Sequence, residues 1–362
     1  MADSRTRVRD FTDRDRKPLV DIDASPVHEV LSALFVATHS SDAAEYEFGS
    51  NVVEQFEMHA SENLKADITA TGPTGEVWLW LIGVALSLPE PRTVETLVAH
   101  LETIDPVLMR RELLTTACIT ESKGFETAAL EGAAAGETGA LETIIGQLDA
   151  ESGLRDLLAL SPTDTRVKLV RIVQQFTDEV FPNLEIDQSA RERDAEDKRA
   201  LALTMAADRL VETATNGITF TPQLEVGRVV LIPSIVARPW VFITDYAAQR
   251  IFVYPVTDEH LTADPDAPPA YLVDLYRALG DEKRLRILGM LGDGPMSLAE
   301  ITERLDLAKS TAHHHLRILR TAGLVRVSVD ETRAYSLRRG AMSEAGPMLD
   351  RYLTGRRSQD VT

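Results

Sequence analysis

Six polar residues near the C-terminus have the types and the spacing of a surface that contacts nucleic acid. They are Lys309, Ser310, Thr311, His313, His314 and Arg317. On a helix, at about 100° per residue, most of them lie opposite an apolar stripe that contains Leu316 and Leu319. The two cations suit phosphate groups, whereas the hydroxyl and imidazole groups suit base edges or the thymine methyl group. The stretch therefore predicts a helix that enters the major groove of double-stranded DNA.

Three successive histidines in this stretch also suggest a metal site. The side chains of His313, His314 and His315 would point about 100° apart on a helix, so they cannot chelate one ion together. His315 falls near the apolar side, which predicts a structural role in the interior. We therefore expect no metal ion and no other cofactor at these residues.

The sequence contains none of the common catalytic motifs that we sought. It lacks G-x-x-x-x-G-K-[ST], G-x-S-x-G and H-E-x-x-H, and no G-x-G-x-x-G follows a strand-like run. Cys118 is the only cysteine, which excludes an intrachain disulfide and a thiolate cluster built within one chain. We therefore expect no enzymatic activity and no catalytic residues.

Capping signals predict the helices that position the polar stretch. Ser297 and Glu300 form an S-x-x-E capping box that opens a first helix. Gly323 follows the polar helix as its C-terminal cap. Another helix, over 270–279, precedes one that Asp281 caps. The pattern predicts two short helices joined by a tight turn, with further helices packed behind them.

The residues after this pair of helices predict a β-hairpin. Valines alternate with polar residues over 325–329, a turn follows over 330–332, and 333–337 return. A hairpin directly after two such helices is a wing, and Arg333 would contact a phosphate or the minor groove from it. A last helix over 343–353 then leads to a basic tail.

These landmarks together resemble the ArsR/SmtB winged-helix repressors. Three motifs support the resemblance. They are A-L-G-D-x-x-R-L-x-I-L from Ala278, H-L-x-x-L at the end of the polar helix from His315, and A-G-L-V from Ala322, which leads into the hairpin. The resemblance covers about 270–340. It implies a homodimeric DNA-binding regulator, a repressor in most members, whose two recognition helices occupy successive major grooves.

The sequence departs from that family in three places. The first helix of the pair lacks the C-x-C of the metal-sensing members, and 343–353 contain no histidine. Neither family metal site therefore carries over to this chain. Ala308 replaces the usual serine cap of the recognition helix, a loss of about 1 kcal/mol.

The long N-terminal part predicts a mainly α fold with a small amount of β structure. We expect a disordered N-terminus (1–18), a mostly helical regulatory or dimerisation domain (19–215), a small antiparallel β subdomain (216–260) and a linker (261–269). The winged helix-turn-helix domain (270–354) and a basic tail (355–362) complete the chain. Aromatic residues of this part either form its core or line a ligand pocket. They are Trp78, Trp80, Phe220, Trp240, Tyr246, Phe252 and Tyr254.

The distribution of charged residues also separates the C-terminal module from the rest of the chain. The net charge is −19, but residues 270–362 hold 15 basic and 12 acidic residues, whereas residues 1–269 hold 23 and 45. A module of +3 on a body of −22 favours DNA binding at the C-terminal end. An acidic body that only increases solubility is the alternative.

The first residues have no apolar segment of the signal-peptide type, and the longest apolar run, 77–88, is too short to cross a bilayer. We therefore predict a cytoplasmic transcriptional regulator with no membrane contact. It would bind an operator as a homodimer, and its N-terminal domain would dimerise, sense a non-metal small-molecule effector of unknown identity, or both. The alternative is a winged-helix protein-interaction module that does not bind DNA sequence-specifically.

Overall fold

We analysed a computed structural model of the chain. The structure describes residues 19–39, 43, 46–71, 75–120, 125–148, 154–220, 226–261, 268, 270–328, 334–338, 346, 349–350 and 352–353. The expected disordered N-terminus, most of the linker and final helix, and the basic tail lie outside these residues, as does Arg333. Within them the chain is mostly helical with two small mixed sheets, which confirms the predicted fold class.

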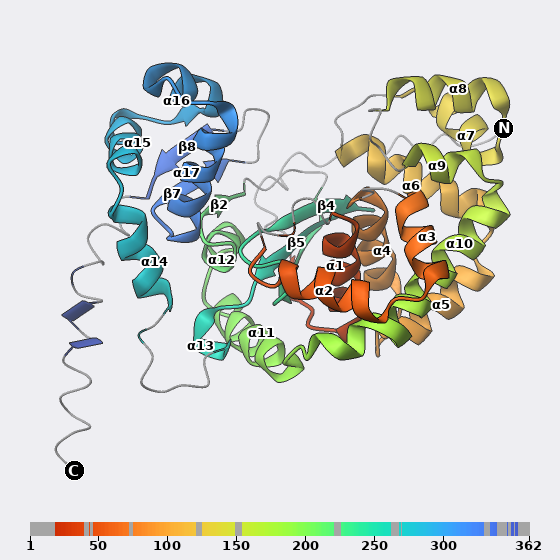
Figure 1. The fold of residues 1–362 in the computed structure, drawn as a ribbon, viewed down its shortest axis with the longest axis horizontal. Coiled ribbons are helices and arrows are strands. Elements are labelled where there is room, and N and C mark those ends of the chain that lie inside the picture. The colour runs from red at the N-terminus through yellow and green to blue at the C-terminus, as the bar shows by residue number, and fades with distance from the viewer. Residues whose placement is uncertain are drawn as a thin grey trace, which may run out of the picture.

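The first sheet has the strand order β1-β3-β5-β4 and forms the centre of the N-terminal body (Figure 1). Its strands are β1 (Leu19–Ile22), β3 (Arg228–Ser234), β4 (Phe242–Tyr246) and β5 (Gln249–Pro255). β1, β3 and β5 are parallel, and β4 pairs antiparallel with β5. The prediction of an antiparallel sheet was therefore wrong. β5 lies between β3 and β4, and strand periodicity carries no information about direction.

Both faces of this sheet are covered, which explains why its strands are continuously apolar. Residues alternate between the two sides along β3 and β5. Val230, Ile232, Ile251 and Val253 join one core with α1 (Pro26–Thr38) and α4 (Gly75–Ser87). Val229, Leu231, Phe252 and Tyr254 pack on the other side with Leu210 and Val211 of α12 (Ala207–Ala214). The sheet is thus the middle layer between helices.

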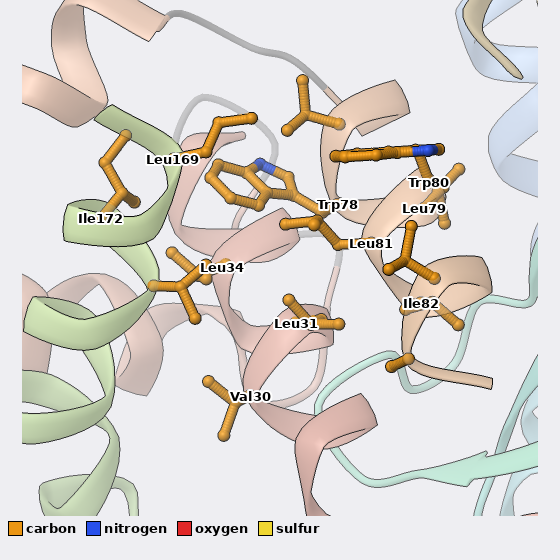
Figure 2. Packing of buried hydrophobic residues seen from close by; sticks show 14 of the residues in the cluster. Val30, Leu31, Leu34, Trp78, Leu79, Trp80, Leu81, Ile82, Leu169 and Ile172 are labelled. Carbon is orange, nitrogen blue, oxygen red and sulfur yellow. The ribbon is translucent and has the colours of Figure 1, made fainter. Parts of the chain in front are cut away.

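Most of the remaining helices of the body lie on the side of α1 and α4, whereas α11 and α13 lie near α12 (Figure 1). The remaining helices are α2 (Gly49–His59), α3 (Glu62–Thr71), α5 (Val94–Thr103), α6 (Pro106–Thr120), α7 (Thr127–Ala135), α8 (Thr138–Gln147), α9 (Leu154–Ala159), α10 (Pro162–Gln175), the π-helical turn Phe176–Val180, the 3-10 turn Phe181–Leu184, α11 (Gln188–Ala202) and α13 (Asp258–Leu261). Figure 2 shows Trp78 of α4 packed between Leu34 of α1 and Leu169 of α10. Trp78 and Trp80 are fully buried and belong to the core. None of the helices in the described part of the chain is long and apolar enough to cross a membrane.

A buried ion pair connects the helices to the end of β3. Glu29 of α1 and Arg191 of α11 lie 3.4 Å apart and are almost completely buried. Glu29 Oε1 accepts the backbone N–H groups of Ile235 and Val236 at 2.8 and 2.9 Å, and Arg191 Nε donates to the carbonyl of Pro233 at 3.0 Å. The pair therefore fixes the point at which the chain leaves β3.

We predict that Glu29→Gln lowers the free energy of unfolding by about 3 kcal/mol, because it leaves the buried Arg191 charge uncompensated. Urea denaturation followed by circular dichroism measures the change. Glu62→Gln is the control, since Glu62 lies at the surface of α3 with its side chain 95% exposed, and should change stability by less than about 0.5 kcal/mol. Equal midpoints for Glu29→Gln and the unmodified chain would show that the pair does not support the fold.

Candidate nucleic-acid interface

The C-terminal module has the helices and the hairpin strands that the sequence predicts, and in addition the short strand β6, which the sequence does not predict. They are α14 (Ala270–Leu279), α15 (Glu282–Asp293), β6 (Met296–Ser297), α16 (Leu298–Leu305), α17 (Lys309–Thr321), β7 (Val325–Ser328) and β8 (Ala334–Leu337). Ser297 and Glu300 form the capping box of α16, and Asp281 Oδ1 accepts from the N–H of Arg284 at 2.9 Å. Gly323 follows α17 with φ +66°. These local predictions are confirmed.

One side of α17 belongs to the core of the module. Ala312, His315, Leu316 and Leu319 are buried, in a cluster that includes Ile287 and Ile301. The helix begins after Ala308, whose side chain provides no capping hydrogen bond. Because the apolar stripe fixes the rotation of α17, the residues on its other side must face outward.

The outward side carries the predicted contact residues. Lys309, Ser310, His313 and His314 are exposed, and Thr311 and Arg317 are partly exposed. All of these except Thr311, together with Leu298, line a hollow of about 390 Å³. Arg317 Nη2 lies 2.9 Å from His314 Nδ1. Since a guanidinium group only donates, Nδ1 of His314 is the acceptor in this pair.

The three histidines of α17 face different surroundings. His313 stacks on Trp240, His314 pairs with Arg317, and His315 is buried with its Nδ1 3.9 Å from Asp281 Oδ1. Burial lowers the pKa of His315 below its ordinary value, although the nearby Asp281 carboxylate opposes the shift. Among the described residues, no group of three His, Cys, Asp or Glu side chains is placed to hold a metal ion.

The wing hairpin belongs to a second sheet with the order β2-β7-β8-β6. β7 and β8 are antiparallel, with Val327 opposite Tyr335, as the sequence predicts for a hairpin. β2 (Ile218–Thr219) pairs parallel with β7, Ile218 opposite Val327. The sequence predicts one β subdomain over 216–260, but β2 is not a strand of the sheet that contains β3, β4 and β5. The buried side chains of Ile218 and Phe220 do pack with the body, whereas the backbone of β2 pairs with the wing.

The backbone at Gly217, just before β2, lies unusually close to the backbone of the module at Val325. Gly217 has φ +108°, and a Cβ atom there would lie 2.9 Å from the carbonyl oxygen of Val325. The N–H of Val327 donates to the carbonyl of Gly217 at 3.2 Å, and Asn216 Nδ2 donates to the carbonyl of Thr321. Glycine is therefore required at 217 for this docking.

Charged side chains also pair between α12 of the body and the wing of the module. Glu212 of α12 lies 2.6 Å from Arg326 of β7 and 3.9 Å from Arg338, which follows β8. Sequence reasoning missed Glu212, because its partners lie more than one hundred residues away along the chain. It also missed Arg320, which is buried and lies one helical turn after Arg317 on the side of α17 that meets the body.

Trp240 of the body lies directly against α17. Its ring stacks on His313 at 6.0 Å between centroids and an angle of 18°. The guanidinium carbons of Arg317 and Arg320 each lie 5.5 Å from the centroid of the indole ring. Two of the predicted DNA-contact residues therefore touch the N-terminal body.

Comparison with known proteins locates the module in a family. A helix-turn-helix domain model matches residues 279–328. Transcriptional activator HlyU of Vibrio cholerae is 45% identical over 56 residues, which are 16% of this chain and 52% of that protein. An uncharacterised HTH-type transcriptional regulator of Methanocaldococcus jannaschii is 37% identical over 60 residues, 16% of this chain and 67% of that protein.

HTH-type transcriptional regulator KmtR of Mycobacterium tuberculosis is 35% identical over 68 residues, 19% of this chain and 52% of that protein. The chain thus spans about half to two thirds of the length of these relatives. No solved structure matches the chain. Through this module, the chain belongs to the ArsR-type helix-turn-helix transcriptional regulators.

Proposed function

We propose that the chain regulates transcription by binding an operator as a homodimer, with α17 in the major groove. The observation that carries this proposal is the two-sided character of α17, whose inner stripe is buried and whose outer side gathers polar side chains around a hollow. Lys309 and Arg317 would contact phosphates, while Ser310, Thr311, His313 and His314 would contact bases. Arg333 would add a wing contact.

The exposed apolar side chains of α14 support dimerisation. Val273 and Tyr276 are 38% and 41% exposed, and Leu353 near the C-terminus is 54% exposed. A second copy that covers these residues would remove apolar area from water. A two-fold dimer would then present its two α17 helices to half-sites about 34 Å apart.

We also propose that the body senses a non-metal signal. A hollow of about 240 Å³ lies between the two parts of the molecule, lined by Asn216 and Arg238 of the body and by Asp274, Arg320 and Thr321 of the module. A molecule bound there would contact both parts at once. It would therefore favour one arrangement of the module over another.

We predict that Arg317→Ala combined with His314→Ala abolishes the gel shift of DNA upstream of the chain's own operon, because it removes a phosphate contact and a base contact together. Binding by the unmodified chain should weaken steeply as salt rises. Arg193→Ala, which removes a half-exposed arginine of the body, should leave the gel shift unchanged. Undiminished binding by the double variant would refute the role of this helix.

We predict that Val273→Asp converts the dimer to a monomer, because a carboxylate in an apolar interface loses its hydration. Sedimentation velocity measures the change. The matched control is Val167→Asp, since Val167 of α10 is 51% exposed on the body. If Val273→Asp stays dimeric, α14 does not form the interface.

A further inference from the structure

The contact between Trp240 and α17 places an aromatic side chain of the body on the proposed DNA-binding side of the helix. We propose that Trp240 competes with DNA for α17, so that the described arrangement is a closed state of low DNA affinity. This inference rests on the proposed function, because it requires His313 and Arg317 to be DNA contacts. Of the three α17 residues that meet the indole ring, these two are the ones assigned to DNA.

The contact between the indole ring and the arginines of α17 is of a kind that can form and break reversibly. An indole face is the best aromatic partner for a guanidinium group, and the attraction grows when the cation is withdrawn from water. Arg320 is 9% exposed, and burial lowers the pKa of its guanidinium group. Each of the three contacts is individually weak, and all of them are lost together when the ring moves. DNA, which offers phosphates to the same arginine, can therefore displace the ring.

A second set of contacts holds the wing in the same closed arrangement. Glu212 pairs with Arg326 and Arg338, two cations of the wing region. The strand pairing of β2 with β7 adds backbone hydrogen bonds beside them. Two arginines that are suited to phosphates thus face a carboxylate of the body. Removing Glu212 should therefore weaken the docking of the wing on the body without altering the indole ring.

The closed arrangement leaves part of the DNA-binding side accessible. Lys309 and Ser310, at the start of α17, are exposed and line the 390 Å³ hollow. DNA can therefore contact the first turn of α17 while Trp240 still covers the middle of that helix. The acidic body beside it repels phosphates until the module moves away. We therefore expect lowered affinity, rather than complete loss of binding, in the closed state.

The test compares DNA affinities of full-length variants by fluorescence anisotropy with the upstream duplex. Trp240→Ala should bind about ten-fold more tightly than the unmodified chain, because the closed state no longer competes. Glu212→Gln should shift affinity in the same direction while keeping the indole ring. Leu203→Ala truncates an 86% exposed side chain elsewhere on the body and should change nothing. Thermal unfolding confirms that each variant is folded.

Hydrogen exchange supplies a readout that does not need DNA. The N–H of Val327, bonded to Gly217 in the closed state, should exchange faster in both releasing variants. Unchanged affinity and unchanged exchange in Trp240→Ala and Glu212→Gln, while Arg317→Ala combined with His314→Ala abolishes binding, would overturn the competition and leave the proposed function standing. DNA binding that is altered neither by Arg317→Ala combined with His314→Ala nor by Trp240→Ala would overturn both.

Discussion

The pairing of β2 with β7 determines how the two parts of the molecule face each other. A wing strand at the edge of a small sheet exposes a row of unpaired backbone groups, and β2 satisfies part of that row. Because β2 follows α12 directly, the pairing also brings Glu212 and Asn216 to the module. With the wing held there, α17 lies within reach of Trp240. The strand pairing thus sets the distance between α17 and the body.

The charges of the two parts determine how their arrangement affects the approach of DNA. The residues before 270 carry −22 and those after carry +3, so the body opposes the approach of a polyanion to the module beside it. Pairing Arg326 and Arg338 with Glu212 reduces the positive potential of the wing further. The module in isolation would therefore present a more positive surface than the module docked on the body. Regulation can act through the arrangement of the two parts, with no change in the internal fold of either.

The sequence predicted what depends on neighbours along the chain. The capping box of Ser297 and Glu300, the end of α17 at Gly323 and the wing hairpin each require only a few adjacent residues. The inward position of His315 followed from helical periodicity. Prediction failed where the partner is distant, as in the parallel pairing of β1 with β3 and the partner of β2. Nothing in the local pattern around Trp240 indicates that α17 lies against it.

The position of Trp240 depends in turn on the interior of the body. Glu29, held by Arg191, accepts the N–H groups of Ile235 and Val236 where the chain leaves β3. The turns that follow bring the N–H of Trp240 to the carbonyl of Ala237 at 2.7 Å. A buried ion pair therefore anchors one end of a short segment whose other end touches α17. Arg238 of this segment also lines the hollow between the two parts, as Arg320 does from the other side. A molecule bound in that hollow would contact Arg320, which is one partner of the indole ring, and Arg238 and Pro239, which precede Trp240 in the chain. The segment from Ile235 to Trp240 is therefore a direct physical connection between the interior of the body and α17.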